Sequence, residues 1–436
     1  MKNLALLVTL FLGCSQAQAF RYPVTSRTLP NGLKVIVCEK PGNDFVEVEV
    51  WYRTGSKDEK PGIRGMAHLF EHMMFRGTEK YPGDAVFKNF DRVGGNYNAY
   101  TSFDRTVYHE SVPTSALELA IDVEADRMNN LKVTQTILNT EREVVGEEFR
   151  NGMNNWYGKM NQERYPYLYP AGHPYEVEII GHLDEITSCT AGQCMNFFDS
   201  YYSPNNAFLL VVGNVKADQV YALAEKYFGS IKKQLNIQPI ANVPDLAQAK
   251  VRTEELGIDY PVQIYSFIHP SPSFSEKDFF ALDLLNNLLF FDNNSILQNR
   301  LMKKEHSVYS IQHPSDSWSL YPSMDVIDVI MPANPGNVKV KKAIREEINR
   351  VIAGGISQET LQKWVNAQEA SITFDDYSCT AIASRLGNFE FAGHDYSLAD
   401  KLLDEYRKVT PEDIKAAAAK YFAEDKLQFI NIKPSF

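Results

Sequence analysis

The stretch His68-Leu69-Phe70-Glu71-His72 decides how the rest of this chain is interpreted. Residues four apart lie on the same face of a helix, so the imidazoles of His68 and His72 can reach a single metal ion. Glu71 lies on the same side, where its carboxylate can hold and deprotonate a metal-bound water. The order His-x-x-Glu-His is the reverse of the more common metal-binding motif His-Glu-x-x-His. A surface helix with two solvated histidines is the alternative interpretation.

A catalytic zinc site usually has three protein ligands and one position for water, so two histidines leave one ligand to be found. The segment 141–148 supplies several carboxylates in a strongly helical context. Glu141 and Glu148 are two helical turns apart and share a face, so one could bind the metal while the other supports a histidine or a water. The spacing alone does not choose among Glu141, Glu143, Glu147 and Glu148. A solvated acidic helix face is the usual meaning of such a run.

The chain resembles the pitrilysin/insulinase-type zinc metallopeptidases, or inverzincins, and in particular their short bacterial and processing-peptidase-like branch. The motifs that carry the resemblance follow one another in order: 29–33 (LPNGL), 55–59 (GSKDE), 65–78 (GMAHLFEHMMFRGT), 94–95 (GG), 98–101 (NAYT), 141–148 (EREVVGEE) and 202–207 (YSPNNA). The match is weaker in the second half of the chain. The family's spacing implies Glu148 as the third zinc ligand, beside His68 and His72, and Glu141 as the glutamate that supports the catalytic site.

The resemblance also implies residues that bind the substrate. Asn98, Ala99 and Tyr100 match the family's edge strand, to which a peptide adds as an extra strand. An ordinary core strand is the alternative. In the second half, Tyr309 matches the tyrosine of an Arg/Tyr pair that reaches the substrate carbonyl, but Met302 stands where the arginine is expected.

A complete metal motif with a missing arginine is typical of the zinc-bearing member of an unlike pair. We therefore expect a homologous, zinc-less partner subunit that forms a heterodimer with this chain. A homodimer, in which Arg300 or Lys303 compensates for the missing arginine, is the second choice. Tyr309 would be only structural in the first case.

The order of predicted elements repeats along the chain. Strands at 33–38 and 45–51 are expected to form a hairpin, followed by the helix with the metal motif, a strand over 97–112 and a buried strand at 208–212. The second half repeats this order, with Leu284-Leu-Asn-Asn-Leu288 in place of the histidines. This pattern predicts an α+β fold of two similar domains, each an antiparallel-rich sheet packed with helices, from an internal duplication. The expected segments are a signal peptide (1–19), an N-terminal zinc-bearing peptidase domain (20–235), a linker (236–252) and a C-terminal inactive homologous domain (253–436).

Length and charge exclude some classes of function. The 436 residues fit two domains of about 200 residues each. The formal net charge of −11 argues against nucleic-acid binding, which needs a basic surface. It also provides no polybasic patch for a membrane surface.

The N-terminus has the pattern of a secretory signal. Lys2 precedes the apolar run 4–12, and 17–19 (AQA) is a small-x-small cleavage site. We expect cleavage near Ala19-Phe20 and export to the periplasm. The apolar run is short for a transmembrane helix, so no stable membrane insertion is expected. Lipidation at Cys14 is the less favoured alternative.

Four cysteines follow the predicted signal, and an oxidising compartment allows them to pair. Cys189 and Cys194 are near enough in sequence to bridge a helix start, but the sequence does not decide whether they do. Cys38 and Cys379 are more typical of buried thiols. None of the four has the spacing of a zinc site.

Together these patterns predict a zinc-dependent endopeptidase that cleaves short or unfolded peptides. It would hold one Zn²⁺ per chain, use a metal-activated water with Glu71 as general base, and form the catalytic half of a two-subunit chamber. The alternative is a non-catalytic binding or scaffold subunit of the same family. Such subunits usually lack some of His68, Glu71, His72 or Glu148, whereas this chain has all four.

Overall fold

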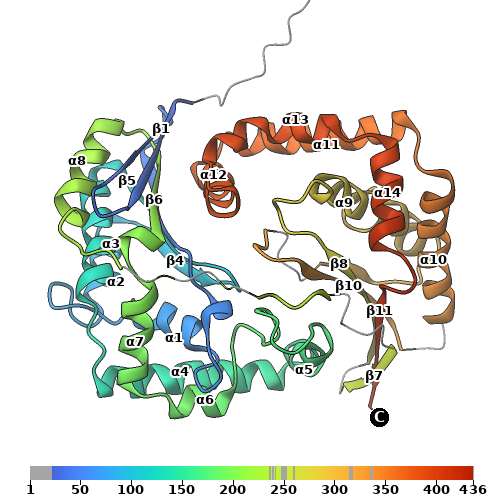
Figure 1. Cartoon of the computed structure of the whole chain (residues 1–436), viewed down its shortest axis with the longest axis horizontal. Helices are drawn as coiled ribbons and strands as arrows, with labels where there is room; N and C mark the ends of the chain where they lie inside the picture. Colours follow the sequence, from blue (N-terminus) through green and yellow to red (C-terminus); the bar gives the residue numbers. More distant parts are fainter. Residues whose placement is uncertain are drawn as a thin grey trace, which may run out of the picture.

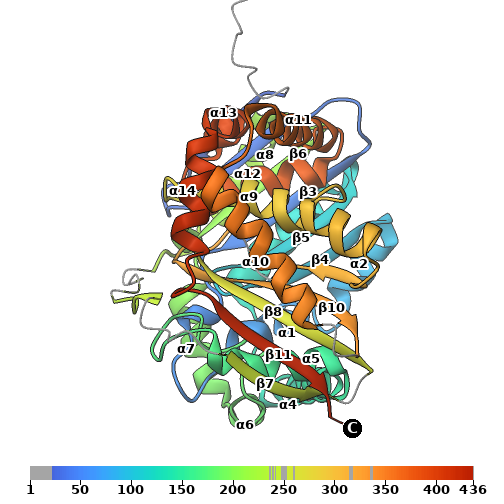
Figure 2. The same ribbon diagram turned by 90° about the vertical axis from the view of Figure 1, so that its right-hand side faces the viewer.

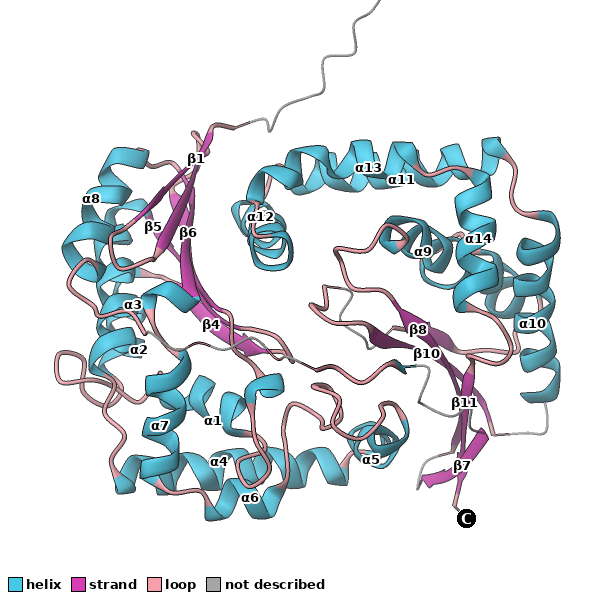
Figure 3. Cartoon of the chain, in the orientation of Figure 1, coloured by secondary structure: helices cyan, strands magenta, loops and turns pink. Residues whose placement is uncertain are grey.

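Each half of the chain forms one sheet packed with helices, as the computed structural model shows (Figures 1 and 3). The structure describes residues 22–234, 237, 240, 242–246, 253–258, 261–313, 318–333 and 337–435. The predicted signal peptide, Cys14 and the cleavage position lie outside these residues, as does most of the predicted linker. The predicted α+β class, with two helix-packed sheets, is confirmed.

The sheet of the first half has the strand order β1-β2-β6-β3-β5-β4. Its strands are β1 (Val24–Thr28), β2 (Lys34–Glu39), β3 (Phe45–Tyr52), β4 (Asn96–Thr101), β5 (Thr106–Pro113) and β6 (Ala207–Gly213). The predicted hairpin of β2 and β3 is wrong, because the buried strand β6 inserts between them, parallel to β2 and antiparallel to β3. Strand β4 is left at the edge.

The predicted single strand over 97–112 is two strands, β4 and β5, joined by a tight turn. The N–H of Ser102 donates to the carbonyl of Arg105 at 2.8 Å, which closes this turn. The hydroxyl of Ser102 accepts from the N–H groups of Asp104 and Arg105, each at 3.3 Å. Serine favours turns for this reason, since its side chain replaces a backbone hydrogen-bond partner.

Alternation along β3 separates the two faces of this sheet. Val46, Val48 and Val50 face a core that is shared with helices of the first half, whereas Trp51 packs on the opposite face. The helices of the first half are α1 (Met66–Met73), α2 (Ala85–Val93), α3 (Leu117–Asn130), α4 (Gln135–Asn154), α5 (Trp156–Arg164), α6 (Leu183–Ser188), α7 (Ala191–Tyr201) and α8 (Ala217–Phe228).

The sheet of the second half has the order β7-β11-β8-β10-β9. Its strands are β7 (Thr253–Ile258), β8 (Val262–Ser271), β9 (Ser310–Gln312), β10 (Ser323–Pro332) and β11 (Gln428–Pro434). Its helices are α9 (Phe279–Asn286), α10 (Asn337–Gly354), α11 (Gln358–Asp375), α12 (Cys379–Gly393), α13 (Leu402–Lys408) and α14 (Pro411–Tyr421). Helices α9, α10 and α14 cover one face of the sheet (Figure 2). Helix α9 follows β8 as α1 follows β3.

Helix α12 of the second half lies on the first sheet, against β3 and β6 (Figure 1). Gly387 makes this approach possible, because a Cβ at this position would lie 2.2 Å from Cζ2 of Trp51. Polar groups hold the same helix: Arg53 donates to the carbonyls of Glu390 and Phe391, at 2.9 and 2.6 Å. Lys34 Nζ lies 2.6 Å from Glu390 Oε2. The second half thus supplies the cover for the inner face of the first sheet.

Helix α5 of the first half makes the reciprocal contact, against the second sheet. Met160 is buried in a cluster with residues of β8, β10 and β11. Arg164 forms a buried ion pair with Asp328 of β10, with Nη1 and Oδ1 2.8 Å apart. The two halves therefore exchange helices, which ties them together at two places.

Two further sequence features can be located in the fold. In the described part of the chain, no helix is both long and apolar enough to cross a bilayer. Cys38, Cys189, Cys194 and Cys379 are buried free thiols. Cys189 and Cys194 are therefore not bridged in this structure, and Cys38 and Cys379 are buried as expected.

Candidate metal centre

Helix α1 carries the metal motif, and its start is held by a buried carboxylate. Glu59 accepts the N–H of Gly65 at Oε2 (2.7 Å) and the N–H of Ala67 at Oε1 (2.8 Å). These N–H groups belong to the first turn, where no helical carbonyl can accept them. A carboxylate here also interacts favourably with the helix dipole. Glu59 therefore sets where α1 begins and how it is oriented.

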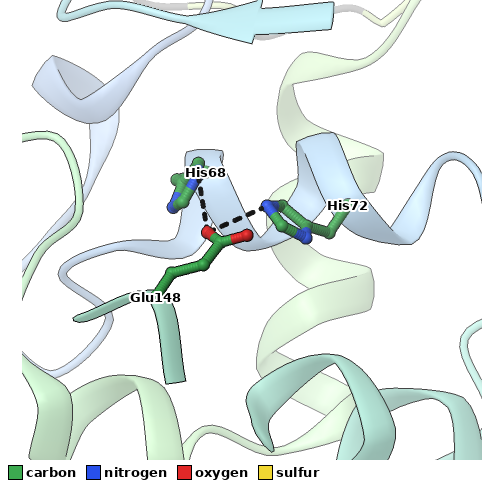
Figure 4. A group of neighbouring side chains, drawn as sticks. All are labelled: His68, His72 and Glu148. Carbon is green, nitrogen blue, oxygen red and sulfur yellow. Dashed lines mark ion pairs between the residues drawn. The ribbon is translucent and has the colours of Figure 1, made fainter. Parts of the chain in front are cut away.

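The apolar face of α1 fixes the rotation of the helix. Phe70 is fully buried and stacks on Phe198 of α7, with ring centroids 5.9 Å apart. It also contacts Tyr202 at 5.4 Å. With this face packed inward, His68 and His72 of the same helix are only partly buried and face α4 (Figure 4).

Three side chains of α1 and α4 converge at this point. Oε2 of Glu148 lies 3.7 Å from Nε2 of His68 and 3.4 Å from Nε2 of His72 (Figure 4). All three potential ligand atoms lie within 4.8 Å of one another. In a tetrahedral zinc site with bonds of 2.0–2.1 Å, neighbouring ligand atoms are about 3.3 Å apart. The donor set and its spacing therefore fit a zinc ion.

The state of His68 also suits a metal ligand. Burial, with a further contribution from the neighbouring His72, lowers its pKa to about 4. The imidazole is therefore neutral near pH 7, with a lone pair for a metal ion. Its Nδ1 is buried and has no hydrogen-bond partner among the described residues.

The structure separates the four glutamates that spacing alone leaves equivalent. Glu148 faces the histidines, whereas Glu141 is buried one layer behind, with Oε2 3.8 Å from Nδ1 of His72. Glu143 and Glu147 point away from the histidines, and their side chains are 79% and 63% exposed beside Arg150. The seven-residue spacing explains why Glu141 and Glu148 share the inner face of α4.

Arg76 is a member of the site that sequence reasoning missed. Its Nε lies 2.6 Å from Oε1 of Glu141, so the carboxylate is held between Arg76 and His72. Arg76 follows α1 and is visible in the motif 65–78, but only the fold shows that it reaches α4. A carboxylate behind a histidine orients the imidazole and raises its basicity.

Glu71 lies between strand β4 and the three potential metal ligands, His68, His72 and Glu148. Its Oε2 accepts a hydrogen bond from Thr101 Oγ1 at 2.7 Å. Burial raises the pKa of the Glu71 carboxyl above its ordinary value, while this hydrogen bond and the neighbouring His72 partly oppose the rise. A carboxylate with a raised pKa is a better proton acceptor near neutral pH.

Strand β4 is an edge strand beside α1, and its side chains alternate between two faces. Ala99 is buried in the core that includes α1, whereas Tyr100 lies on the opposite face and is 37% exposed. The ring of Tyr100 meets that of Trp51 edge-on at 6.3 Å. Asn98 is exposed. The free edge of β4 is therefore close to the three potential metal ligands. A peptide that pairs with this edge as an added strand would need that position to reach the metal.

The family resemblance singles out two positions in the second half, Tyr309 and Met302. Tyr309 precedes β9, and its side chain is 62% exposed. Met302 lies in the π-helical segment Gln298–Lys304 and packs against the core of the second half.

Comparisons with known proteins identify the family. A model described as insulinase (peptidase family M16) matches residues 34–167, and one described as the peptidase M16 inactive domain matches 188–368. The zinc protease PqqE of Helicobacter pylori is 30% identical over 98% of this chain and 97% of its own length. This chain belongs to the insulinase (M16) peptidase family.

Two solved structures have the same fold as this chain. The crystal structure of a protease from Helicobacter pylori has a TM-score of 0.89 and 27% identity, and the match covers 95% of this chain and 100% of that one. The periplasmic protease PqqL of Escherichia coli has a TM-score of 0.77 and 21% identity over 95% of this chain and 48% of its own. The second likeness concerns the fold alone.

Replacement of one imidazole tests the metal centre. His72→Ala should lose zinc, because two remaining ligands cannot hold the ion against water. His109→Ala is the matched control: His109 lies on the neighbouring strand β5 and is not in the ligand group, so this variant should keep zinc. Zinc per chain is measured on the purified, dialysed proteins by atomic emission. Zinc retained near one ion per chain by His72→Ala would contradict the assignment.

Proposed function

We propose that this chain is a zinc-dependent endopeptidase that cleaves short or unfolded peptides, with one zinc ion per chain. The observation that carries the proposal is the meeting of three potential zinc ligands with an adjacent carboxylate. His68, His72 and Glu148 supply the ligand atoms, and Glu71 lies beside them on α1. A relative named as a zinc protease, which matches the chain over nearly its whole length, supports this reading.

The roles of the side chains follow from their positions. When bound, zinc would lower the pKa of a water and polarise the scissile carbonyl. Glu71 accepts the proton of the attacking water at Oε1, since Oε2 already receives the hydroxyl of Thr101. It then delivers this proton to the leaving amine. Glu141, braced by Arg76, lies 3.8 Å from Nδ1 of His72, where it would orient the imidazole so that Nε2 can bind the metal.

The edge strand β4 accounts for the proposed class of substrate. Asn98, Ala99 and Tyr100 would pair through their backbone with a peptide that adds as an extra strand. Main-chain pairing tolerates many side chains, but it requires an extended segment. Folded proteins offer few such segments, so short or unfolded peptides are the substrates that fit.

A non-catalytic binding or scaffold role is less well supported. Subunits without catalysis need neither the metal ligands nor the general base, and this chain has all four groups in one place. The match to the M16 inactive domain concerns 188–368, which contains α9 without the histidines. We therefore place the chemistry in the first half.

We also propose the domain boundaries and the location expected from the sequence. The boundaries 20–235, 236–252 and 253–436 are supported by the strands, since β1 to β6 lie within 24–213 and β7 to β11 within 253–434. Export with a signal peptide at 1–19 is supported by the sequence pattern of Lys2, the apolar run 4–12 and the small-x-small site at 17–19.

The test of the proposed chemistry is Glu71→Gln. The amide is nearly isosteric with the carboxylate but cannot accept the proton, so turnover should fall by about 10² to 10⁴-fold. Zinc content and peptide binding should stay at the level of the unmodified chain. Cleavage of a mixed peptide pool, with and without a chelator, is followed by mass spectrometry. A variant that cleaves at more than a tenth of the original rate would show that Glu71 is not the base.

We further propose that this chain works with a homologous, zinc-less subunit that supplies the missing arginine. Met302 has a thioether and cannot donate a hydrogen bond to a carbonyl. Its cationic neighbours are engaged within the chain: Arg300 forms ion pairs with Glu346 and Glu347, each at 2.8 Å. Lys303 donates to the carbonyl of Asn293. These contacts weigh against the homodimer in which one of them compensates.

The partner proposal predicts little activity from the chain alone. Addition of a homologue that carries the Arg/Tyr pair should raise peptide cleavage by about 100-fold or more, since one donor to a developing oxyanion contributes about that much. The mass in solution and the rate are measured with and without the homologue. Full activity as a homodimer, unchanged by Arg300→Ala and Lys303→Ala, would refute the need for a donated arginine.

A further inference from the structure

The hydroxyl of Thr101 touches the carboxylate that we propose as the general base. Its Oγ1 lies 2.7 Å from Oε2 of Glu71, although 30 residues separate the two in the chain. We infer that Thr101 is a positioning residue, which fixes the orientation of Glu71 and couples it to the edge strand β4. This inference rests on the proposed peptidase function and deepens it.

Strand geometry explains why the hydroxyl of Thr101 faces α1. Side chains two apart on a strand share a face. Tyr97 packs against Phe75, with ring centroids 6.4 Å apart, and Ala99 is buried in the same core. Thr101 is the next residue on this face, so the register that packs Tyr97 and Ala99 against this core also directs Thr101 toward α1. Tyr100 and its neighbours on the other face cannot take this role.

The backbone of Thr101 is held in place from both sides. Thr101 pairs with Thr106 at the end of the β4–β5 hairpin, and the turn follows immediately. Gly55 packs against this turn so closely that a Cβ would lie 2.3 Å from the carbonyl oxygen of Ser102. The donor that Thr101 offers is therefore pre-positioned, as precise orientation of a catalytic group requires.

The hydrogen bond matters because a carboxylate turns easily. The last torsion of a glutamate side chain is broad, so an unrestrained carboxylate samples many orientations. The bond from Thr101 occupies one oxygen and leaves Oε1 of Glu71 for the proton of the attacking water. Strand β4 would also carry the peptide, so the same strand aligns the substrate and the base. Misalignment of a catalytic group by a small distance costs rate more than binding.

The proposal is tested by removing the hydroxyl without changing the shape of the side chain. Thr101→Val should lower kcat on a peptide by about 10-fold or more, the size expected for a lost hydrogen bond to a charged group. KM and bound zinc should remain near the values of the unmodified chain. Thr101→Ser, which keeps the hydroxyl, should restore most of kcat. In the Glu71→Gln background, Thr101→Val should leave the Kd for the peptide unchanged.

Thr106→Val is the matched control. It makes the same chemical change at the residue paired with Thr101, whose hydroxyl donates to Thr54 instead of Glu71. Its kcat should stay close to that of the unmodified chain, so a general effect of hydroxyl loss in this hairpin would be detected. Thermal melting of each variant shows whether the fold is retained.

Several results would overturn the inference. An unchanged kcat in Thr101→Val, or a raised KM with unchanged kcat, would exclude a positioning role. A Thr101→Ser variant as slow as Thr101→Val would show that the hydroxyl is not the active feature. A fall of equal size in Thr106→Val would assign the effect to the hairpin. An unmodified chain that cleaves no peptide, even with its partner, would instead refute the proposed function on which the inference rests.

Discussion

The placement of helix α1 is the constraint on which the site depends. Its N-terminus is held by the buried carboxylate of Glu59, and its apolar face is locked by Phe70 against α7. With the position and rotation of α1 settled, His68 and His72 can face only α4. The carboxylate of Glu148 then completes a set of ligand atoms with the spacing that zinc requires. A shift of α1 by one residue would turn the histidines away from this set.

The second half contributes to this arrangement through packing. Its helix α12 covers the inner face of the first sheet, and the absence of a side chain at Gly387 lets Trp51 lie against that helix. In return, Met160 of α5 is buried against the second sheet, and Arg164 pairs with Asp328 there. Exchange of helices makes the orientation of each half depend on the other. This accounts for a second half that lacks the His-x-x-Glu-His motif but still matches an M16 family model.

Much of the fold and the centre of the site could be predicted from local patterns. The helical spacing of His68 and His72 and the repeated element order are visible in the sequence. The choice of Glu148 over Glu141 needed the family resemblance, because two residues on one helical face are equivalent until the neighbouring helix is placed. Strand pairing was harder: β6, far along the chain, inserts between β2 and β3.

The supporting residues Arg76 and Thr101 could not be assigned from the sequence for the same reason. Each acts on a residue that becomes its neighbour only through the fold: Thr101 reaches Glu71, and Arg76 reaches Glu141. Such contacts leave no periodic pattern, since they depend on how separate elements pack. Arg300 shows the converse case. Its place near Met302 in the sequence suggested that it could replace the missing arginine, but its side chain forms three ion pairs within the second half, which argue against this role.

The central claim is that one zinc ion is held by two imidazoles and one carboxylate from α1 and α4. X-ray diffraction from crystals of the zinc-loaded chain, collected on both sides of the zinc absorption edge, tests it most directly. The account predicts one anomalous peak per chain, with His68, His72 and Glu148 as ligands at about 2.0–2.2 Å. A peak at another place, or a cysteine sulfur among the ligands at about 2.3 Å, would contradict it.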